Sequence, residues 1–396
     1  MQYQEILHRC FRCGYCKLPG NYTDINCPAY LKYRFETFAP GGRLWLIRGW
    51  LDGKIETSRR LQEILFSCAT CRNCVEHCAF PKFREDILHA FTAAKEMLID
   101  EGSVPPGVRD YLTRLFEHGN PYKIPQKKRG DWATDIDVAP FRDQEYLLYI
   151  GDVGSFDERA QHIARAVANA LRLGGLSFGI LGPREASDGN DAHALGEIEL
   201  FKHVAEKNLQ TFNDLGVRKV ITLSPHAYNA MRNDYPALGG QQEVWHYTQI
   251  LRRILNQLPF PDSPSRTRIT YHDPCYLGRH NREYEAPREI LRSIPGLELV
   301  EMERCKQNAL CCGGGGGNFF SDIVSSGSET SAKSRVREAA ETNARILATS
   351  CPICTVMLED ALKSENLDHK IEVKEISEII WERVDPSSAA QGRATG

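Results

Sequence analysis

The chain has 396 residues, of which 42% are apolar and 26% charged, a composition typical of a globular protein with two or three domains. Its net charge of −3 gives no indication of binding to nucleic acid. No window approaches the roughly 18 consecutive apolar residues of a membrane span. The segment Met1–Cys10 also lacks the zones of a signal peptide. We therefore expect a cytoplasmic protein without a transmembrane segment, and peripheral membrane association is left open.

The 14 cysteines are the unusual feature of the composition. Eight lie between Cys10 and Cys78, and six lie between Cys275 and Cys354. In a long chain without an export signal, tight C-x-x-C runs favour metal binding over disulfides.

The N-terminal cysteines form two runs, one C-x-x-C-x-x-C followed by Cys-Pro and one C-x-x-C-x-x-C-x-x-x-C. Three thiolates at this spacing wrap one turn of chain around a [4Fe–4S] cube, and the fourth ligand comes from the other run. Two four-iron sites are therefore predicted. The first site comprises Cys10, Cys13, Cys16 and Cys78, and the second site comprises Cys68, Cys71, Cys74 and Cys27. A pair of zinc sites is the alternative, but zinc usually takes pairs of cysteines and not triplets.

The residues that follow these runs have helical periodicity. Within 86–99, one face carries the apolar residues Ile87, Leu88, Phe91, Ala94 and Leu98, which predicts a helix packed over the clusters. Residues 1–125 are thus expected to form a helical ferredoxin-like domain with two [4Fe–4S] clusters. A turn-rich linker is expected over residues 126–143. Its basic run Lys127-Lys128-Arg129 is expected to be solvated, with docking to a partner as the alternative.

From Glu145 onward, short apolar runs alternate with helical periods, which predicts α/β layering. Strands are expected over 146–150, 178–181, 219–223, 269–272 and 344–349, with helices such as 157–173 and 194–215 between them. A proline-rich break at 259–268 divides this part into a first unit (144–262) and a second unit (263–384). Residues 385–396 are expected to form a disordered tail. The predicted fold class is α+β multidomain, with the helical domain followed by two duplicated α/β units.

The duplication rests on an internal repeat. Residues 217–227 (VRKVITLSPHA) resemble residues 344–354 (ARILATSCPIC), and three anchor points keep offsets of 123, 124 and 127 residues. In the second unit the aligned positions are cysteines, which we call the third site: Cys275, Cys311, Cys312, Cys351 and Cys354. In the first unit the same positions hold Asp152, Ser187, Asp188, Ser224 and Ala227. Only the second unit is therefore expected to bind a cluster.

Three further features lie near these positions. The run Gly313–Gly317 lacks the Lys and Ser/Thr of a phosphate-binding loop, so we expect it to wrap a cluster closely. Cys305 is expected to be a bystander thiol. His226 and His246 are expected to be structural, with proton supply near the third site as the alternative.

The third site and the stretch His272–Arg279 (HDPCYLGR) resemble the CCG cysteine-rich domain found in the B and D subunits of heterodisulfide reductase. A two-cluster module followed by two such units resembles the D subunit in particular. In that family each intact unit binds a noncubane [4Fe–4S] cluster, and two such clusters flank the disulfide that is cleaved. The resemblance implies one noncubane cluster at the third site. It does not imply heterodisulfide reduction, because the first unit lacks the ligands.

These expectations favour an iron–sulfur electron-transfer subunit of a multi-subunit redox complex. It would relay electrons between a flavin-containing partner and a terminal reductase or acceptor, as in heterodisulfide reductase-like or class II benzoyl-CoA reductase complexes. The chain has no G-x-G-x-x-G fingerprint after a strand, so the flavin is expected on the partner. One alternative is a catalytic thiol–disulfide or quinone reductase subunit acting at a single noncubane cluster. Another is a scaffold that holds zinc at the third site.

Overall fold

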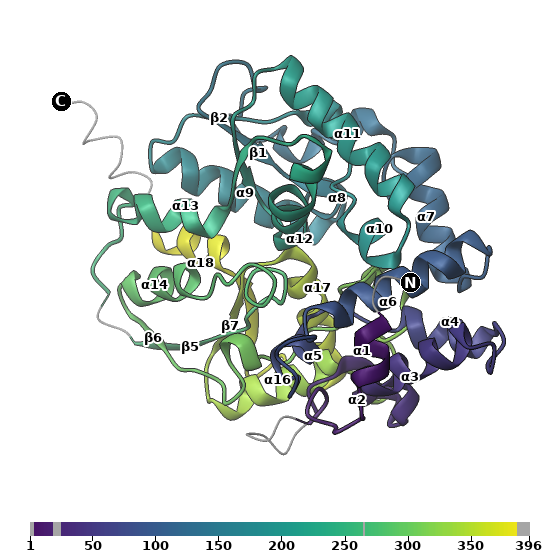
Figure 1. The fold of residues 1–396 in the computed structure, drawn as a ribbon. Coiled ribbons are helices and arrows are strands. Elements are labelled where there is room, and N and C mark those ends of the chain that lie inside the picture. Colours follow the sequence, from purple (N-terminus) through teal and green to yellow (C-terminus); the bar gives the residue numbers. More distant parts are fainter. Residues whose placement is uncertain (1–3, 19–24, 264–265, 386–396) are drawn as a thin grey trace.

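The computed structural model describes residues 4–18, 25–263 and 266–385. Figure 1 shows the N-terminal helices in purple and blue along the right-hand side, with the purple ones at the lower right. The first unit, in teal, lies at the top, and the second unit, in green and yellow, lies at the lower left. All but the first residue of the expected tail at 385–396 lies outside the described residues. The fold is mixed helix and parallel sheet.

The N-terminal part contains helices joined by loops and turns, with no strand among its described residues. Its helices are α1 Gln4–Arg9, α2 Pro28–Tyr33, α3 Pro40–Leu51, α4 Arg59–Phe66, α5 Asn73–Glu76, α6 Asp86–Asp100 and α7 Pro106–His118. The predicted helix over 86–99 is confirmed as α6, and all five residues of its apolar face are buried. Burial of this face joins the helix to the core that surrounds the cysteine runs.

The first unit contains a four-stranded parallel sheet in the order β2-β1-β3-β4. Its strands are β1 Tyr146–Tyr149, β2 Phe178–Gly179, β3 Lys219–Thr222 and β4 Glu243–His246. Its helices are α8 Gly151–Phe156, α9 Glu158–Leu173, α10 Asn190–Leu195, α11 Ile198–Asp214, α12 Pro225–Asn229 and α13 Tyr247–Ile254. Helices connect the successive strands, as parallel pairing requires.

The second unit repeats this topology in the order β6-β5-β7-β8. Its strands are β5 Thr267–Tyr271, β6 Leu297–Leu299, β7 Ile346–Thr349 and β8 Glu372–Glu375. Its helices are α14 Glu285–Ser293, α15 Asn318–Ser321, α16 Ser331–Glu341, α17 Pro352–Ser364 and α18 Ile376–Arg383. The same strand order in both sheets is consistent with a duplicated unit.

Expectation and structure differ at the sheet edges. The five expected strands correspond to β1, β2, β3, β5 and β7, whereas β4, β6 and β8 were missed. The missed strands lie at the edges of the sheets and carry exposed glutamates, such as Glu243, Glu298 and Glu372. Edge strands tolerate charged residues, so they lack the apolar run that identifies a central strand.

The single helix expected over 194–215 was also wrong. The chain forms α10 and α11 with a break at Gly196, whose φ is +88°. A Cβ at this position would lie 2.5 Å from the backbone nitrogen of Glu96 in α6, so the break lets the first unit approach the N-terminal helices.

The expected linker packs against the first sheet. It contains two short 3₁₀ turns, Gln126–Lys128 and Asp131–Ala133, and Pro140 bridges to Ile180 beside β2. Lys127 and Lys128 are exposed as expected, but Arg129 is 1% exposed. The expectation of a solvated run was therefore wrong for Arg129, because buried carboxylates of the first unit pair with it.

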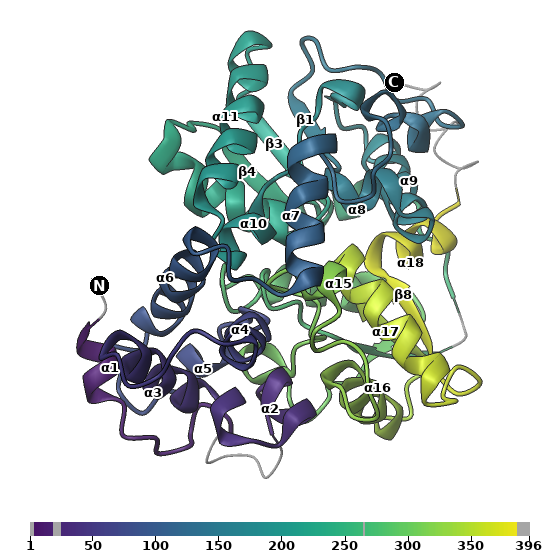
Figure 2. The same cartoon turned by 90° about the vertical axis from the view of Figure 1, so that its right-hand side faces the viewer.

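Contacts around Thr70 and Gly316 are among those that hold the N-terminal part against the second unit, and Figure 2 shows these two parts side by side. The Thr70 hydroxyl lies 2.8 Å from the Tyr276 hydroxyl, and Nε2 of His280 donates to the Thr70 carbonyl at 2.8 Å. A Cβ at Gly316 would lie 2.5 Å from the Cys68 carbonyl oxygen. The glycine run therefore permits close approach to the loop that carries the second site.

No helix within the described part of the chain has both the length and the apolar character that a bilayer crossing requires.

Candidate iron–sulfur centres

The third site lies at the carboxyl ends of the two central strands of the second sheet. Cys275 follows β5, and Cys351 follows β7 as the N-cap of α17. From β5 the chain continues to β6 on one side of the sheet, whereas β7 pairs with β5 on the other side. The space between the ends of β5 and β7 is therefore the topological switch point of the sheet. Parallel sheets bind ligands at such points, because the connecting loops diverge there.

The five third-site cysteines are all buried, with exposures of 0–5%. The Sγ atoms of Cys275 and Cys311 are 3.8 Å apart, and those of Cys312 and Cys354 are 3.4 Å apart. Backbone amides also point at sulfur: Gly313 N lies 3.3 Å from Cys311 Sγ. Converging buried thiols with amide donors suit an iron–sulfur centre, because thiolates hold the iron and amides stabilise the sulfur charge.

The electrostatics of the third site favour thiolates at two of its cysteines. Burial raises the pKa of Cys351, but hydrogen bonds from Cys354 and His226 outweigh it and lower the pKa to about 6. The pKa of Cys312 is held well below its usual range by hydrogen bonds from Cys311 and Cys354, with a further contribution from His272. A lowered thiol pKa favours metal binding, because the thiolate is the ligand.

The first-site cysteines line one cavity at the edge of the N-terminal helices. Cys10, Cys13, Cys16 and Cys78 surround it together with apolar residues such as Leu44 and Ile87. Cys13 is exposed and the other three thiols are partly buried. Burial raises the pKa of Cys16 to about 12, with neighbouring thiols adding to the shift. Metal binding must therefore supply the free energy that deprotonates this thiol.

The second-site cysteines line a separate cavity, deeper in the protein. Cys27, Cys68, Cys71 and Cys74 are all buried, and Leu88 and Phe91 of α6 close the cavity. Cys16 of the first site also reaches this cavity, so the two cysteine sets are adjacent. Each set joins three cysteines of one run to one from the other, which is the pattern of two-cluster ferredoxins.

The second and third sites touch at one cysteine from each. Cys71 packs in the same buried cluster as Cys275 and Cys311. A hydrogen bond with the Cys311 thiol, together with burial, raises the pKa of Cys71 well above its usual range. The three cysteine sets therefore form a continuous series from the exposed Cys13 to the enclosed third site.

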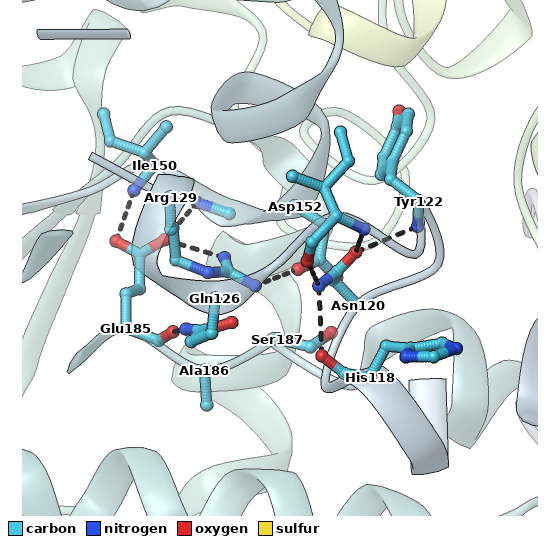
Figure 3. Close-up of polar contacts among 12 residues, drawn as sticks. His118, Asn120, Tyr122, Gln126, Arg129, Ile150, Asp152, Glu185, Ala186 and Ser187 are labelled. Carbon is cyan, nitrogen blue, oxygen red and sulfur yellow. Dashed lines mark hydrogen bonds and ion pairs between the residues drawn. The ribbon is translucent and has the colours of Figure 1, made fainter. Parts of the chain in front are cut away.

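The first unit holds a buried ion-pair network where the second unit holds cysteines (Figure 3). Arg129 belongs to the linker. Its Nη2 lies 2.5 Å from Asp152 Oδ1, and its Nη1 lies 3.3 Å from Glu185 Oε1. Glu185 also accepts hydrogen bonds from the backbone of Ile150 and Gly151, at 3.0 and 2.8 Å. The guanidinium compensates buried carboxylates that would otherwise be costly to bury.

The remaining aligned positions of the first unit offer few metal ligands. Ser187 and Ala227 are buried, and the Ser224 hydroxyl accepts a hydrogen bond from His226 N at 3.1 Å. Burial, with Asp152 nearby, raises the pKa of Asp188 to about 7. Hydroxyl and carboxylate oxygens are poor ligands for an iron–sulfur core.

Comparisons with known proteins agree with the cysteine patterns. Residues 6–80 match the family described as 4Fe-4S dicluster domain, and residues 269–359 match the family described as Cysteine-rich domain. The chain is similar to the probable iron-sulfur-binding oxidoreductase FadF of Bacillus subtilis, with 34% identity over 82% of this chain and 47% of that protein. It is also similar to the EtfAB:quinone oxidoreductase of Syntrophomonas wolfei, with 32% identity over 82% of this chain and 47% of that protein. The chain spans about half the length of these two relatives.

A third relative matches along almost its whole length. The D subunit of the dihydromethanophenazine:CoB--CoM heterodisulfide reductase of Methanosarcina barkeri is 30% identical over 97% of this chain and 95% of that protein. The chain belongs to the family of heterodisulfide reductase D subunits. As a member of this family it is an iron–sulfur redox protein, and the resemblance inferred from its cysteines is confirmed.

The structure of the chain also shows buried contacts for residues that the sequence analysis did not single out. His272 forms a group with Cys312 and Cys354 whose ligand atoms lie within 4.8 Å of one another. Its position three residues before Cys275 was the available signal. Arg279, four residues after Cys275, is buried between the second and third sites. Arg129 was missed because only tertiary structure shows which member of a basic run is buried.

Proposed function

We propose that the chain is an electron-transfer subunit that holds three iron–sulfur clusters. The proposed ligands are the four cysteines of the first site, the four of the second site and the five of the third site. When bound, the clusters supply one-electron chemistry at each site. The residues of the chain hold them in series and exclude water from the second and third sites.

The observation that carries this proposal is the continuous series of cysteine sets. Cys16 reaches the cavity of the second site, and Cys71 packs in the same buried cluster as Cys311 of the third site, whose thiol raises the pKa of Cys71. Electrons can therefore pass between a partner near the exposed Cys13 and the enclosed third site. The partner at Cys13 is proposed to carry a flavin, and other iron–sulfur subunits complete the complex.

We further propose the domain layout that this function requires. Residues 1–125 hold the two cubes, 126–143 link them to the rest, and 144–262 form a metal-free copy of the unit at 263–384. The third site is proposed to hold a noncubane cluster, since five thiols for four irons suit an opened cluster better than a cube.

The proposal is tested by metal content and by turnover. Anaerobic assays should find about 12 iron atoms per chain, from three four-iron clusters. Reduced by a viologen dye, the loaded chain alone should show reducible clusters by EPR but little turnover of disulfides or quinones. Sustained turnover of about 10 per second, an ordinary enzymatic rate, would contradict the relay and favour a single-cluster reductase.

The reductase is the second candidate, and a cavity beside the third site supports it. Thr70, Asn190, Tyr276 and His280 line this cavity at the junction of the N-terminal part and both units. Tyr276 follows Cys275 directly and stacks on His280 at 4.2 Å between ring centroids. A substrate bound there would lie close to the third site.

Zinc at the third site is the remaining alternative. The group of His272, Cys312 and Cys354 offers the nitrogen and sulfur ligands that zinc prefers. About eight iron atoms and one zinc per chain would identify this case.

A further inference from the structure

Arg279 is a buried cation that has no carboxylate partner among the described residues. It lies in the turn after β5 and is 1% exposed. Its Nε donates to the Cys71 carbonyl at 2.6 Å, and Nη1 donates to the Ala309 carbonyl at 2.5 Å. Both acceptors are neutral, so these hydrogen bonds fix the guanidinium but leave its charge uncompensated. A buried charge of this kind is destabilising unless an anion lies nearby.

The anions around Arg279 belong to two different sites. Burial lowers the pKa of Arg279, but the charge that Cys71, Cys275 and Cys311 carry when deprotonated, as cluster ligands would be, outweighs burial and raises it. Cys71 belongs to the second site, and the other two belong to the third. Nη2 is buried and has no hydrogen-bond partner within the described ranges. The guanidinium is therefore held between two cysteine sets, and the two N–H groups of Nη2 are left to donate to them.

We propose that Arg279 is the shared counter-cation of the second and third sites. The inference rests on the proposed function, because it requires a cluster at each site. A positive charge close to a cluster favours its reduced state, since reduction adds one negative charge. Arg279 therefore raises the reduction potentials of both clusters.

The shared position has a consequence for electron transfer. An electron that leaves one cluster arrives at the other, and Arg279 stabilises it in both places. No proton has to move, because a guanidinium keeps its proton at any ordinary pH. Arg279 thus raises both potentials without favouring either cluster over the other.

Arg43 provides a matched control. It is also 1% exposed, and it donates to the Ile64 carbonyl and to Ser67 Oγ, each at 2.8 Å. It lines the cavity of the second site, and its charge lowers the pKa of Cys27 against the raising effect of burial. Arg43 therefore resembles Arg279 in its burial and in donating to neutral acceptors, but it faces one site only.

The experiment is an EPR-monitored redox titration of the loaded protein and three variants, after iron content has been measured. Arg279→Gln should lower the reduction equilibrium constants of the second and third clusters by about tenfold or more, which is a shift of about 59 mV for a one-electron couple. Arg279→Lys keeps the charge and should shift both by less than half of that. Arg43→Gln should shift the second cluster only, and the first cluster should stay unchanged in every Arg279 variant.

The outcomes separate the inference from the function on which it rests. Fewer than about 12 iron atoms in the unaltered protein contradicts the proposed function. Full iron content with one or neither potential shifted in Arg279→Gln overturns the shared role. Equal shifts in Arg279→Lys and Arg279→Gln also overturn it, because the hydrogen bonds and not the charge would then matter. If Arg279→Gln loses iron, the lysine variant decides: both potentials near those of the unaltered protein support the proposal, and loss of iron there too overturns it.

Discussion

The two α/β units have the same strand order but different chemistry at the carboxyl ends of their central strands. Ser224 caps α12 and Cys351 caps α17, and each helix begins with a proline. Each cap accepts a backbone hydrogen bond, Ser224 from His226 N at 3.1 Å and Cys351 from Cys354 N at 3.5 Å. The same local backbone thus presents oxygen in one unit and sulfur in the other. Cap and proline determine the backbone, and side-chain chemistry alone determines whether metal can bind.

The comparison also shows what replaces a metal centre. The first unit receives Arg129 from outside its own sheet, and this residue pairs with Asp152 and Glu185. The second unit keeps Arg279 beside its cysteines instead. In both units a buried guanidinium lies near the anionic groups at the switch point, because buried anions require compensation whether they are carboxylates or thiolates.

The largest effect is expected from the cap residues themselves. Cys351→Ser should remove the third cluster and about four of 12 iron atoms, because an oxygen ligand replaces a thiolate in the most enclosed cysteine set. Cys312→Ser should do the same. Ser224→Ala, the matched change in the first unit, should leave the iron content unchanged. Iron and acid-labile sulfide assays check this, and iron loss in the Ser224 variant would show that the first unit binds metal.

The next effect concerns the ion-pair network of the first unit. Arg129→Ala leaves Asp152 and Glu185 buried without their cation, and we expect a loss of about 3–5 kcal/mol in the free energy of unfolding. Lys128→Ala, at the exposed neighbouring position, should stay within about 0.5 kcal/mol. Anaerobic urea unfolding followed by circular dichroism measures both. A loss below about 1 kcal/mol for Arg129→Ala would mean that water or protons compensate these carboxylates.

The smallest effect is a pH dependence at Asp188, which aligns with Cys312. Its pKa of about 7 lies above the ordinary 3.8, because burial and Asp152 disfavour its charged form. The folded state therefore binds the proton more tightly than the unfolded state. The resulting contribution to the free energy of unfolding is fully present below about pH 4 and is lost as pH rises through about 7. It amounts to at most about 1.4 kcal/mol for each unit by which the folded-state pKa exceeds the unfolded-state pKa.

Asp188→Asn removes this dependence. Relative to the unaltered protein, the variant should gain stability between about pH 5 and pH 8, as measured by unfolding at both values. Asp152, Asp191 and His226 also act on Asp188, so Ser187→Ala serves as the control that leaves these groups in place. An unchanged pH profile in Asp188→Asn would mean that another of these groups takes up the proton.

The sequence by itself determined much of this protein. The cysteine spacings predicted the candidate ligand sets, the apolar face of α6 predicted a buried helix, and the repeat predicted two units. Each of these signals is local: a C-x-x-C run, a helical period or a cap followed by proline acts within a few residues. For this reason the central strands and the resemblance to heterodisulfide reductase could be inferred before any coordinates.

Only the tertiary structure decided which distant groups meet. The contact of Cys71 with Cys311 joins two cysteine runs from opposite ends of the chain, and the pairing of Arg129 with Asp152 joins the linker to α8. The edge strand β8 was also invisible in sequence, since pairing with β7 and not its composition makes it a strand. These features depend on burial and on the energy of charges placed far apart in the chain, and neither has a local pattern that a sequence can display.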